Sequence, residues 1–215
     1  MTIVLRRLVP CIAILLAAGC SLWPFARGDD APEPSRPAGQ AAPADAFFRR
    51  VAALCGHAFE GHVTVDSPTQ QGMSPFNDKR LIMHVRGCSK DTLRIPFLVG
   101  DDRSRTWVLT RTAAGLQLKH DHRHEDGSED PLSLYGGDSL GAGSAQRQEF
   151  PADDASKELF EREDRAVSIT NVWAMEIEPG DHFVYELSRP GRLFRVEFDL
   201  SRPIPPPPAP WGWSD

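Results

Sequence analysis

Hydrophobic and polar residues alternate with a period of two along most of the chain after residue 58. An alternation of this kind places apolar side chains on one face of a β-strand and polar side chains on the other. Tight turns, of which Asp126-Gly127 is the strongest, separate neighbouring stretches and favour antiparallel pairing. The pattern predicts eight or nine strands within residues 59–65, 81–86, 93–99, 105–112, 116–125, 131–135, 167–177, 183–187 and 194–200.

Two segments have a helical period instead. Asp45 is a plausible N-cap for a helix over residues 46–55, with Phe47, Phe48 and Val51 on its buried stripe. A shorter helix is predicted near residues 154–163. Because strands and helices do not alternate, a parallel sheet is not expected.

Many half-polar strands in succession must close on themselves or stack in order to bury one face. We therefore predict a mainly β fold, an antiparallel barrel of eight or nine strands with one N-terminal and one short internal helix. In outline such a barrel resembles the lipocalins and related calycins. A β-sandwich is the alternative.

The first twenty residues have the pattern of an export signal. Arg6 and Arg7 precede an apolar run, residues 8–19, that is too short to cross a bilayer. The motif Leu16-Ala17-Ala18-Gly19-Cys20 resembles the lipobox of bacterial lipoproteins. That resemblance implies a signal peptide over residues 1–19, a lipid on Cys20 and, with Ser21 next, an outer-membrane protein that faces the periplasm. An ordinary cleaved signal and a secreted protein are the alternative.

The rest of the chain divides by composition. Residues 20–44 are rich in Pro, Ala and Gly, which predicts a flexible tether, and residues 45–202 form the β domain. Residues 203–215 form a Pro- and Trp-rich tail, which we interpret as disordered. Docking on a partner and folding back over the domain are the alternatives for this tail.

Cysteine content and charge agree with export. Cys55 and Cys88 are the cysteines of the predicted β domain, and an exported protein is expected to pair them, although two buried thiols remain an alternative. Without Arg6 and Arg7, 22 basic side chains face 30 acidic ones, a net charge of −8. Such a domain repels phosphate backbones, so nucleic acid is excluded as a partner.

The most unusual segment is residues 116–125, where histidines stand at every second position. Leu116, Leu118, His120, His122 and His124 share one face of the predicted strand. The two leucines make this the inward face, so the three imidazoles are predicted to line the barrel interior. Counting across the Asp126-Gly127 turn predicts that Leu132 and Leu134 of the next strand lie opposite His120 and Leu118.

Neighbouring histidines on one face lie about 6.6–7 Å apart, close enough to share a zinc or copper ion. His120 and His124 are too far apart for all three to bind one ion. A site would combine His122 with one neighbour and a ligand from elsewhere, such as His84, His62, His182 or a carboxylate. The alternatives are a pocket for a small molecule and a polar cluster that binds nothing.

The segment Gly137-Asp138-Ser139-Leu140-Gly141 resembles the Gly-Asp-Ser-Leu signature of a lipase and esterase family. A nucleophilic Ser139 needs a histidine base, and the one histidine that follows it, His182, directly follows Asp181 rather than being spaced from it. That family is α/β, whereas this chain is predicted to be mainly β. The esterase is therefore a weak hypothesis.

Residues 94–111 and 119–128 are similar to segments of uncharacterised secreted proteins of proteobacteria, which implies a location and no activity. The sequence thus favours a non-catalytic envelope lipoprotein, anchored to the membrane, whose barrel binds a small hydrophobic ligand or a metal ion near His120, His122, His124 and His84. The alternative is a structural protein of the outer membrane that binds another envelope protein through its tail.

Overall fold

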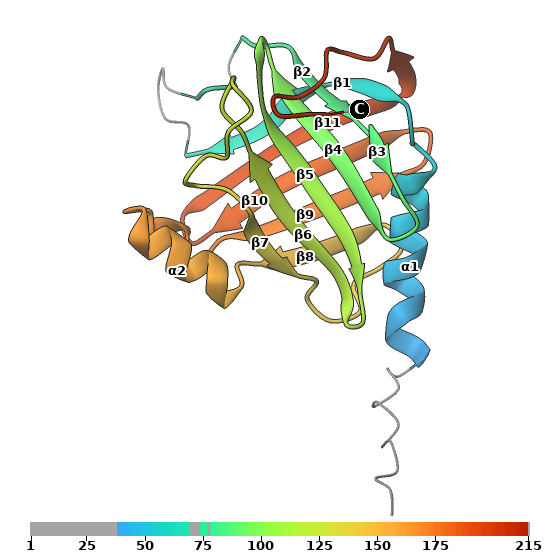
Figure 1. Ribbon diagram of the computed structural model, residues 1–215. Coiled ribbons are helices and arrows are strands. Elements are labelled where there is room, and N and C mark those ends of the chain that lie inside the picture. Colours follow the sequence, from blue (N-terminus) through green and yellow to red (C-terminus); the bar gives the residue numbers. More distant parts are fainter. Residues whose placement is uncertain (1–37, 69–73, 77, 215) are drawn as a thin grey trace, which may run out of the picture. The chain divides into compact units, whose positions relative to one another are not determined.

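The computed structural model describes residues 38–68, 74–76 and 78–214. Within these ranges the chain forms two α-helices, one 3-10 helix and eleven strands of a single antiparallel sheet (Figure 1). The helices are α1 (Ala38–Ala52), α2 (Asp154–Arg162) and η1 (Ala166–Ser168). The strands are β1 (Ala58–Ser67), β2 (Leu81–His84), β3 (Gly87–Cys88), β4 (Thr92–Val99), β5 (Asp102–Thr112), β6 (Gly115–His122), β7 (Tyr135–Asp138), β8 (Arg147–Pro151), β9 (Val172–Glu178), β10 (His182–Arg189) and β11 (Arg192–Ile204).

The sheet curls into a nearly closed barrel. Its strands follow the order β7-β6-β5-β4-β2-β1-β11-β10-β9-β8, and the two-residue β3 pairs with β4. The outer strands meet where Leu140 N donates to Glu149 O at 2.7 Å and Asp153 N donates to Gly136 O at 2.9 Å. The prediction of a mainly β antiparallel barrel with two α-helices is confirmed. More strands form than the eight or nine expected, because β3, β7 and β8 are too short to show a clear alternation.

Inward-facing side chains of the long strands fill much of the barrel. In β5, Arg105, Trp107 and Leu109 alternate with outward-facing residues, and Trp107 and Leu109 are fully buried. Rings from distant strands meet there, for example Trp107 and Phe198 at 6.2 Å. The core is thus aromatic, and it is continuous from β4 to β11.

Helix α1 packs at one end of the barrel. Phe47, Phe48 and Val51 are buried, as predicted, and Asp45 forms an ion pair with Arg111 near the β5–β6 turn. The helix begins at Ala38, within the segment expected to be a tether, so Asp45 lies inside it rather than at its N-cap. Alanine favours helix strongly, and the buried apolar face offsets the cost of Pro43.

A disulfide joins Cys55 and Cys88, whose Cα atoms lie 6.3 Å apart. The predicted pairing is therefore confirmed, and it fastens the chain after α1 to β3. The predicted signal peptide and the lipid attachment at Cys20 lie outside the described residues. Among the described helices, none is both long enough and apolar enough to cross a membrane.

The predicted register between β6 and β7 is wrong. His120 lies opposite Tyr135 and Leu118 opposite Gly137, so the pairing is shifted by three residues. The shift arises because residues 123–134 form an irregular connection in which Ser133 Oγ accepts a hydrogen bond from His122 N. Leu134 adopts a positive φ of 57° and is exposed rather than inward.

The C-terminal tail folds back over the outside of the barrel, which is the second alternative to the disorder expected for it (Figure 1). Trp211 N donates to Arg103 O at 3.0 Å, and Arg103 Nη1 donates to Ala209 O at 2.8 Å. The Trp213 ring lies beside the guanidinium groups of Arg86 and Arg94, at 5.2 and 5.9 Å.

Candidate functional site

The paired strands β5 and β6 carry two of the predicted histidines into the barrel. Trp107 lies opposite His120, and Arg105 lies opposite His122. The same inward face continues through Leu109 and Leu118, which are fully buried. The prediction that Leu116 and Leu118 mark the inward face is confirmed for His120 and His122.

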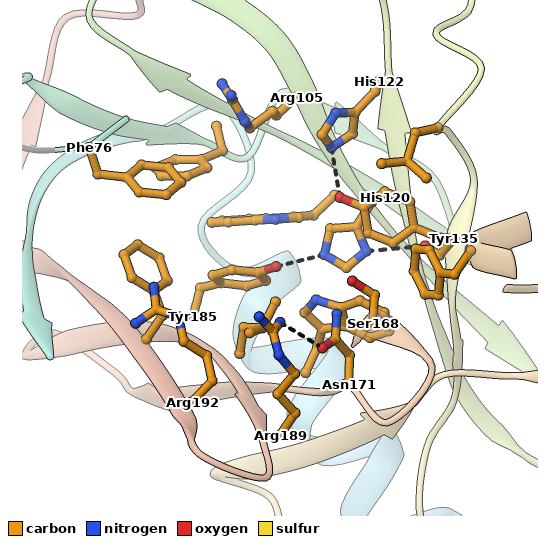
Figure 2. A pocket seen from close by; sticks show the side chains of 17 residues that line it. Phe76, Arg105, His120, His122, Tyr135, Ser168, Asn171, Tyr185, Arg189 and Arg192 are labelled. Carbon is orange, nitrogen blue, oxygen red and sulfur yellow. Dashed lines mark hydrogen bonds between the residues drawn. The ribbon is translucent and has the colours of Figure 1, made fainter. Parts of the chain in front are cut away.

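His120 is held by hydrogen bonds at both ring nitrogens (Figure 2). Nδ1 lies 3.1 Å from the backbone oxygen of Tyr135, and Nε2 lies 2.8 Å from the hydroxyl of Tyr185. A carbonyl oxygen only accepts, so Nδ1 carries the proton, and in the neutral ring Nε2 accepts from the Tyr185 hydroxyl. Burial, with a smaller contribution from His122, lowers the pKa of His120 to about 3. At neutral pH this imidazole is therefore uncharged.

His122 and Tyr135 form a second pair further along the same face. His122 Nε2 lies 3.1 Å from the Tyr135 hydroxyl. Burial, followed by the charge of Arg105, lowers the pKa of His122 to about 4. Burial also raises the pKa values of Tyr135 and Tyr185. The four rings thus form two neutral, hydrogen-bonded pairs at neutral pH.

These pairs line a cavity of about 280 Å³ inside the barrel. Its volume is close to the lower end of the range of about 300–1,000 Å³ that is typical of ligand pockets. Aromatic rings form most of its wall, among them Phe97, Trp107, Phe160, Trp173 and Phe194. The cavity lies away from α1, because Arg105 lines it whereas Arg111, six residues along β5, contacts α1.

Three arginines also line the cavity, one from β5 and two from the consecutive strands β10 and β11. Arg105 pairs with Asp102 at 2.6 Å, and Arg192 pairs with Asp66. Arg189 donates to Asn171 Oδ1 at 3.1 Å, a neutral partner (Figure 2). An aromatic cavity with cationic groups on its wall can bind a small apolar molecule that carries an acceptor or a negative charge.

The structure places two predicted site residues elsewhere. His124 follows the end of β6, is exposed, and lies 3.8 Å from Asp130. The strand ends at His122 because Arg123 already pairs with Glu129 across the following loop. His84 is buried on the same face of β2 as Ile82, whereas Leu81 and Met83 face the core, so it does not reach the cavity.

A metal site at His120 and His122 would need a third ligand from elsewhere in the fold. Among the described residues, no group of three or more His, Cys, Asp or Glu side chains is close enough to hold an ion. Both nitrogens of His120 already have partners, and His122 Nε2 contacts a tyrosine. The two neighbouring imidazoles are therefore better explained as part of the cavity wall.

Ser139 has a structural role at the end of β7. Its hydroxyl accepts a hydrogen bond from Leu116 N at 3.1 Å, and its own N–H donates to Leu116 O at 2.7 Å. Within the described part of the chain, none of its hydrogen bonds involves a histidine. The strand-to-helix turn that a nucleophilic serine requires is also not formed, since β7 leads into a loop and then into β8.

Sequence reasoning missed the partners of the histidines. Trp173 of β9 and Tyr185 of β10 contact His120 of β6, and they meet it only because the sheet curls. The alternation within residues 167–177 and 183–187 indicated that these side chains point inward. Nothing in the sequence, however, shows which strands face each other across a barrel.

Comparison of the chain with protein-family models, with curated proteins and with solved structures finds no match.

Proposed function

We propose that this protein is a non-catalytic binding protein that takes a small, largely apolar molecule into the barrel cavity. The observation that carries the proposal is a half-open cavity of about 280 Å³ that adjoins an otherwise filled aromatic core. Most barrels of this size fill their interior with side chains, so an interior space lined by aromatic rings favours ligand binding.

The polar groups in the wall support binding rather than chemistry. His120 uses both ring nitrogens within the protein, and its lowered pKa keeps it neutral. It is therefore poorly placed to exchange a proton with a substrate. Its hydrogen bonds instead fix the positions of Tyr135 and Tyr185 and give the cavity a defined shape.

The experiment uses the neutral fluorescent probe N-phenyl-1-naphthylamine. The wild-type chain should bind it saturably at one site per molecule. Leu132 lines the cavity, so Leu132→Trp should fill the space and weaken binding at least about ten-fold. Leu140→Trp is the matched control, because Leu140 is 61% exposed, and it should bind like the wild type.

Circular dichroism and thermal unfolding must show that both variants are folded. If the folded Leu132→Trp variant binds the probe as tightly as the wild type does, the cavity is not the binding site. Absence of saturable binding by the wild type would end the proposal.

We propose further that the protein works at the cell envelope, tethered by a lipid on Cys20. The support is the lipobox-like motif of residues 16–20 together with the Cys55–Cys88 disulfide, which suits an oxidising compartment. The full chain expressed in a Gram-negative host should partition into detergent, and Cys20→Ser should move it to the aqueous phase. Equal partitioning of both would contradict the anchor.

A further inference from the structure

We propose that the ligand of this cavity carries a carboxylate and that Arg189, Asn171 and Trp173 bind it. This inference rests on the proposed function and names the class of ligand. Its basis is a group of hydrogen-bond donors, on one face of two paired strands, that the protein itself leaves without an anionic partner.

Strand pairing brings the three side chains together. Ser188 lies opposite Val172 and Leu187 opposite Trp173 in the β9–β10 pair. Asn171 directly precedes β9, Trp173 is the second residue of that strand, and both line the cavity together with Arg189, the last residue of β10. The hydrogen bond from Arg189 Nη1 to Asn171 Oδ1 confirms this proximity.

The charges around the cavity do not balance. Asp102 pairs with Arg105 and Asp66 pairs with Arg192, whereas no carboxylate among the described residues pairs with Arg189. Burial and the neighbouring Arg192 lower the pKa of Arg189 from its ordinary value. This cation therefore lacks a compensating charge, and a bound anion would supply one and offset the repulsion from Arg192.

Trp173 supplies a second, independent observation. It is 1% exposed, and its indole N–H is buried without a hydrogen-bond partner in the described part of the chain. A buried donor of this kind costs about 1–3 kcal/mol if it stays unpaired. Because the Trp173 ring lines the cavity, a small shift of the ring would bring this N–H to an acceptor on a ligand.

The hydrogen bonds of the other polar groups in the cavity wall also indicate where an acceptor on the ligand would bind. Asn171 Oδ1 accepts from Arg189, so the amide NH₂ of Asn171 is left as a donor. The proton of the Tyr185 hydroxyl and the Nδ1 proton of His120 are both used within the protein. Donors without an anionic partner therefore gather at Arg189, Asn171 and Trp173, whereas the His120–Tyr185 pair uses both of its protons within the protein.

One unpaired guanidinium favours a ligand with one negative charge, and a carboxylate matches its planar donors. The apolar part of such a ligand would pack against the rings of the wall, for example Trp107 and Phe194. The ligand class is thus a monocarboxylate with a small apolar body.

The test compares decanoate with decanol, two chains of equal length, by isothermal titration calorimetry at pH 7. The wild type should bind decanoate at least about ten-fold more tightly than decanol. Arg189→Gln should weaken decanoate binding by about that factor and leave decanol binding unchanged. Trp173→Phe should weaken decanoate binding about three-fold or more, since it removes the indole N–H while keeping an aromatic ring.

Arg202→Gln is the matched control, because the Arg202 side chain is 86% exposed, and it should not change either affinity. Equal affinity for decanoate and decanol in the wild type would overturn the carboxylate assignment and leave the proposed function intact. A loss of decanoate affinity in Arg202→Gln equal to that in Arg189→Gln would also overturn it, because the effect would then come from net charge. If neither compound nor the neutral probe binds, the proposed function itself fails.

Discussion

His120 and His122 make the stability of the barrel depend on pH. Their pKa values are lowered to about 3 and about 4 in the folded chain, against an ordinary value near 6.5 when unfolded. Between about pH 4 and 6.5 the unfolded chain therefore binds more protons than the folded chain, so stability falls as the pH falls. At pH 5 we expect a loss of about 2 kcal/mol per histidine relative to pH 7, measured by urea denaturation.

Two variants isolate this effect from other titrating groups. His122→Gln removes one titrating ring and should reduce the loss between pH 7 and pH 5 by about 2 kcal/mol, while His120 and the buried His84 still contribute. Tyr135→Phe removes the hydroxyl partner of His122 but no group that titrates in this range, and it should keep most of the loss. His182, whose pKa is raised by its hydrogen bond with Asp181, acts in the opposite direction in every variant and cancels in the comparison. An unchanged pH dependence in His122→Gln would contradict the assignment.

The sequence predicted which way these two rings point but not what they touch. Leu116 and Leu118 identified the inward face because parity is a local property of a strand. Tyr185 is 65 residues away from His120, and its contact exists only once β10 and β6 face each other across the barrel. His124 was placed wrongly because it follows the end of β6, and the alternation of inward and outward side chains holds only within the strand.

At the scale of the elements, the seam between β7 and β8 is the weakest part of the barrel. The two strands meet through few backbone hydrogen bonds, near Gly136 and Leu140. Gly137 permits this approach, because a Cβ on it would lie 1.9 Å from Pro151 O. A side chain larger than hydrogen would therefore push the two strands apart.

Gly137→Ala should lower the free energy of unfolding by about 2 kcal/mol or more. It should also weaken binding of N-phenyl-1-naphthylamine, because Tyr135 of β7 lines the cavity. Denaturant titration and fluorescence measure the two effects. Asp138→Ala, on the next and exposed residue of the same strand, is the control and should cost less than about 0.5 kcal/mol. A Gly137→Ala variant as stable as this control would mean that the seam does not need the close approach.

Elements with a long, regular alternation were predictable, and the irregular ones were not. β5 and β10 follow the predicted stretches closely, and α2 matches the expected internal helix. β6 ends three residues early, β11 extends beyond the predicted stretch at both ends, and the strand predicted over residues 167–177 begins only at Val172, after η1. The register of β7 was predicted wrongly because the connection from β6 is longer than a turn at Asp126-Gly127 alone. Ser133 and Leu134 belong to this connection rather than to a strand, and the turn dipeptide gives no indication of that. The start of α1 was missed because a Pro- and Ala-rich composition is compatible with both a tether and a helix.

At the scale of the whole molecule, binding and stabilisation are assigned to different parts of the barrel. The cavity is lined from β4, β5, β6, β7, β9, β10 and β11, together with α2, η1, the segment before β2 and the connections that precede β7 and β9. Helix α1 packs near the β5–β6 turn, away from the cavity. The tail covers the outer side of β4 and β5 and contributes no residue to the cavity wall. The composition of the tail predicted extended backbone, but only the three-dimensional positions of Arg86 and Arg94 show where Trp213 docks.

Removal of the tail should therefore separate stability from binding. Truncation after Ile204, the last residue of β11, removes both hydrogen bonds with Arg103 and the Trp213 ring that packs against Gly87. Two hydrogen bonds of about 1 kcal/mol each and two cation–π contacts of about 0.5–1 kcal/mol each add up to an expected loss of about 3–4 kcal/mol in the free energy of unfolding. The affinity for N-phenyl-1-naphthylamine should stay within about two-fold of the wild type, because the cavity wall remains complete. Ser214→Ala, at an exposed position of the same tail, serves as the control for both measurements. A truncated protein that keeps full stability would mean that the tail only rests on the barrel, whereas one that is folded but loses the probe would mean that the tail reaches the cavity.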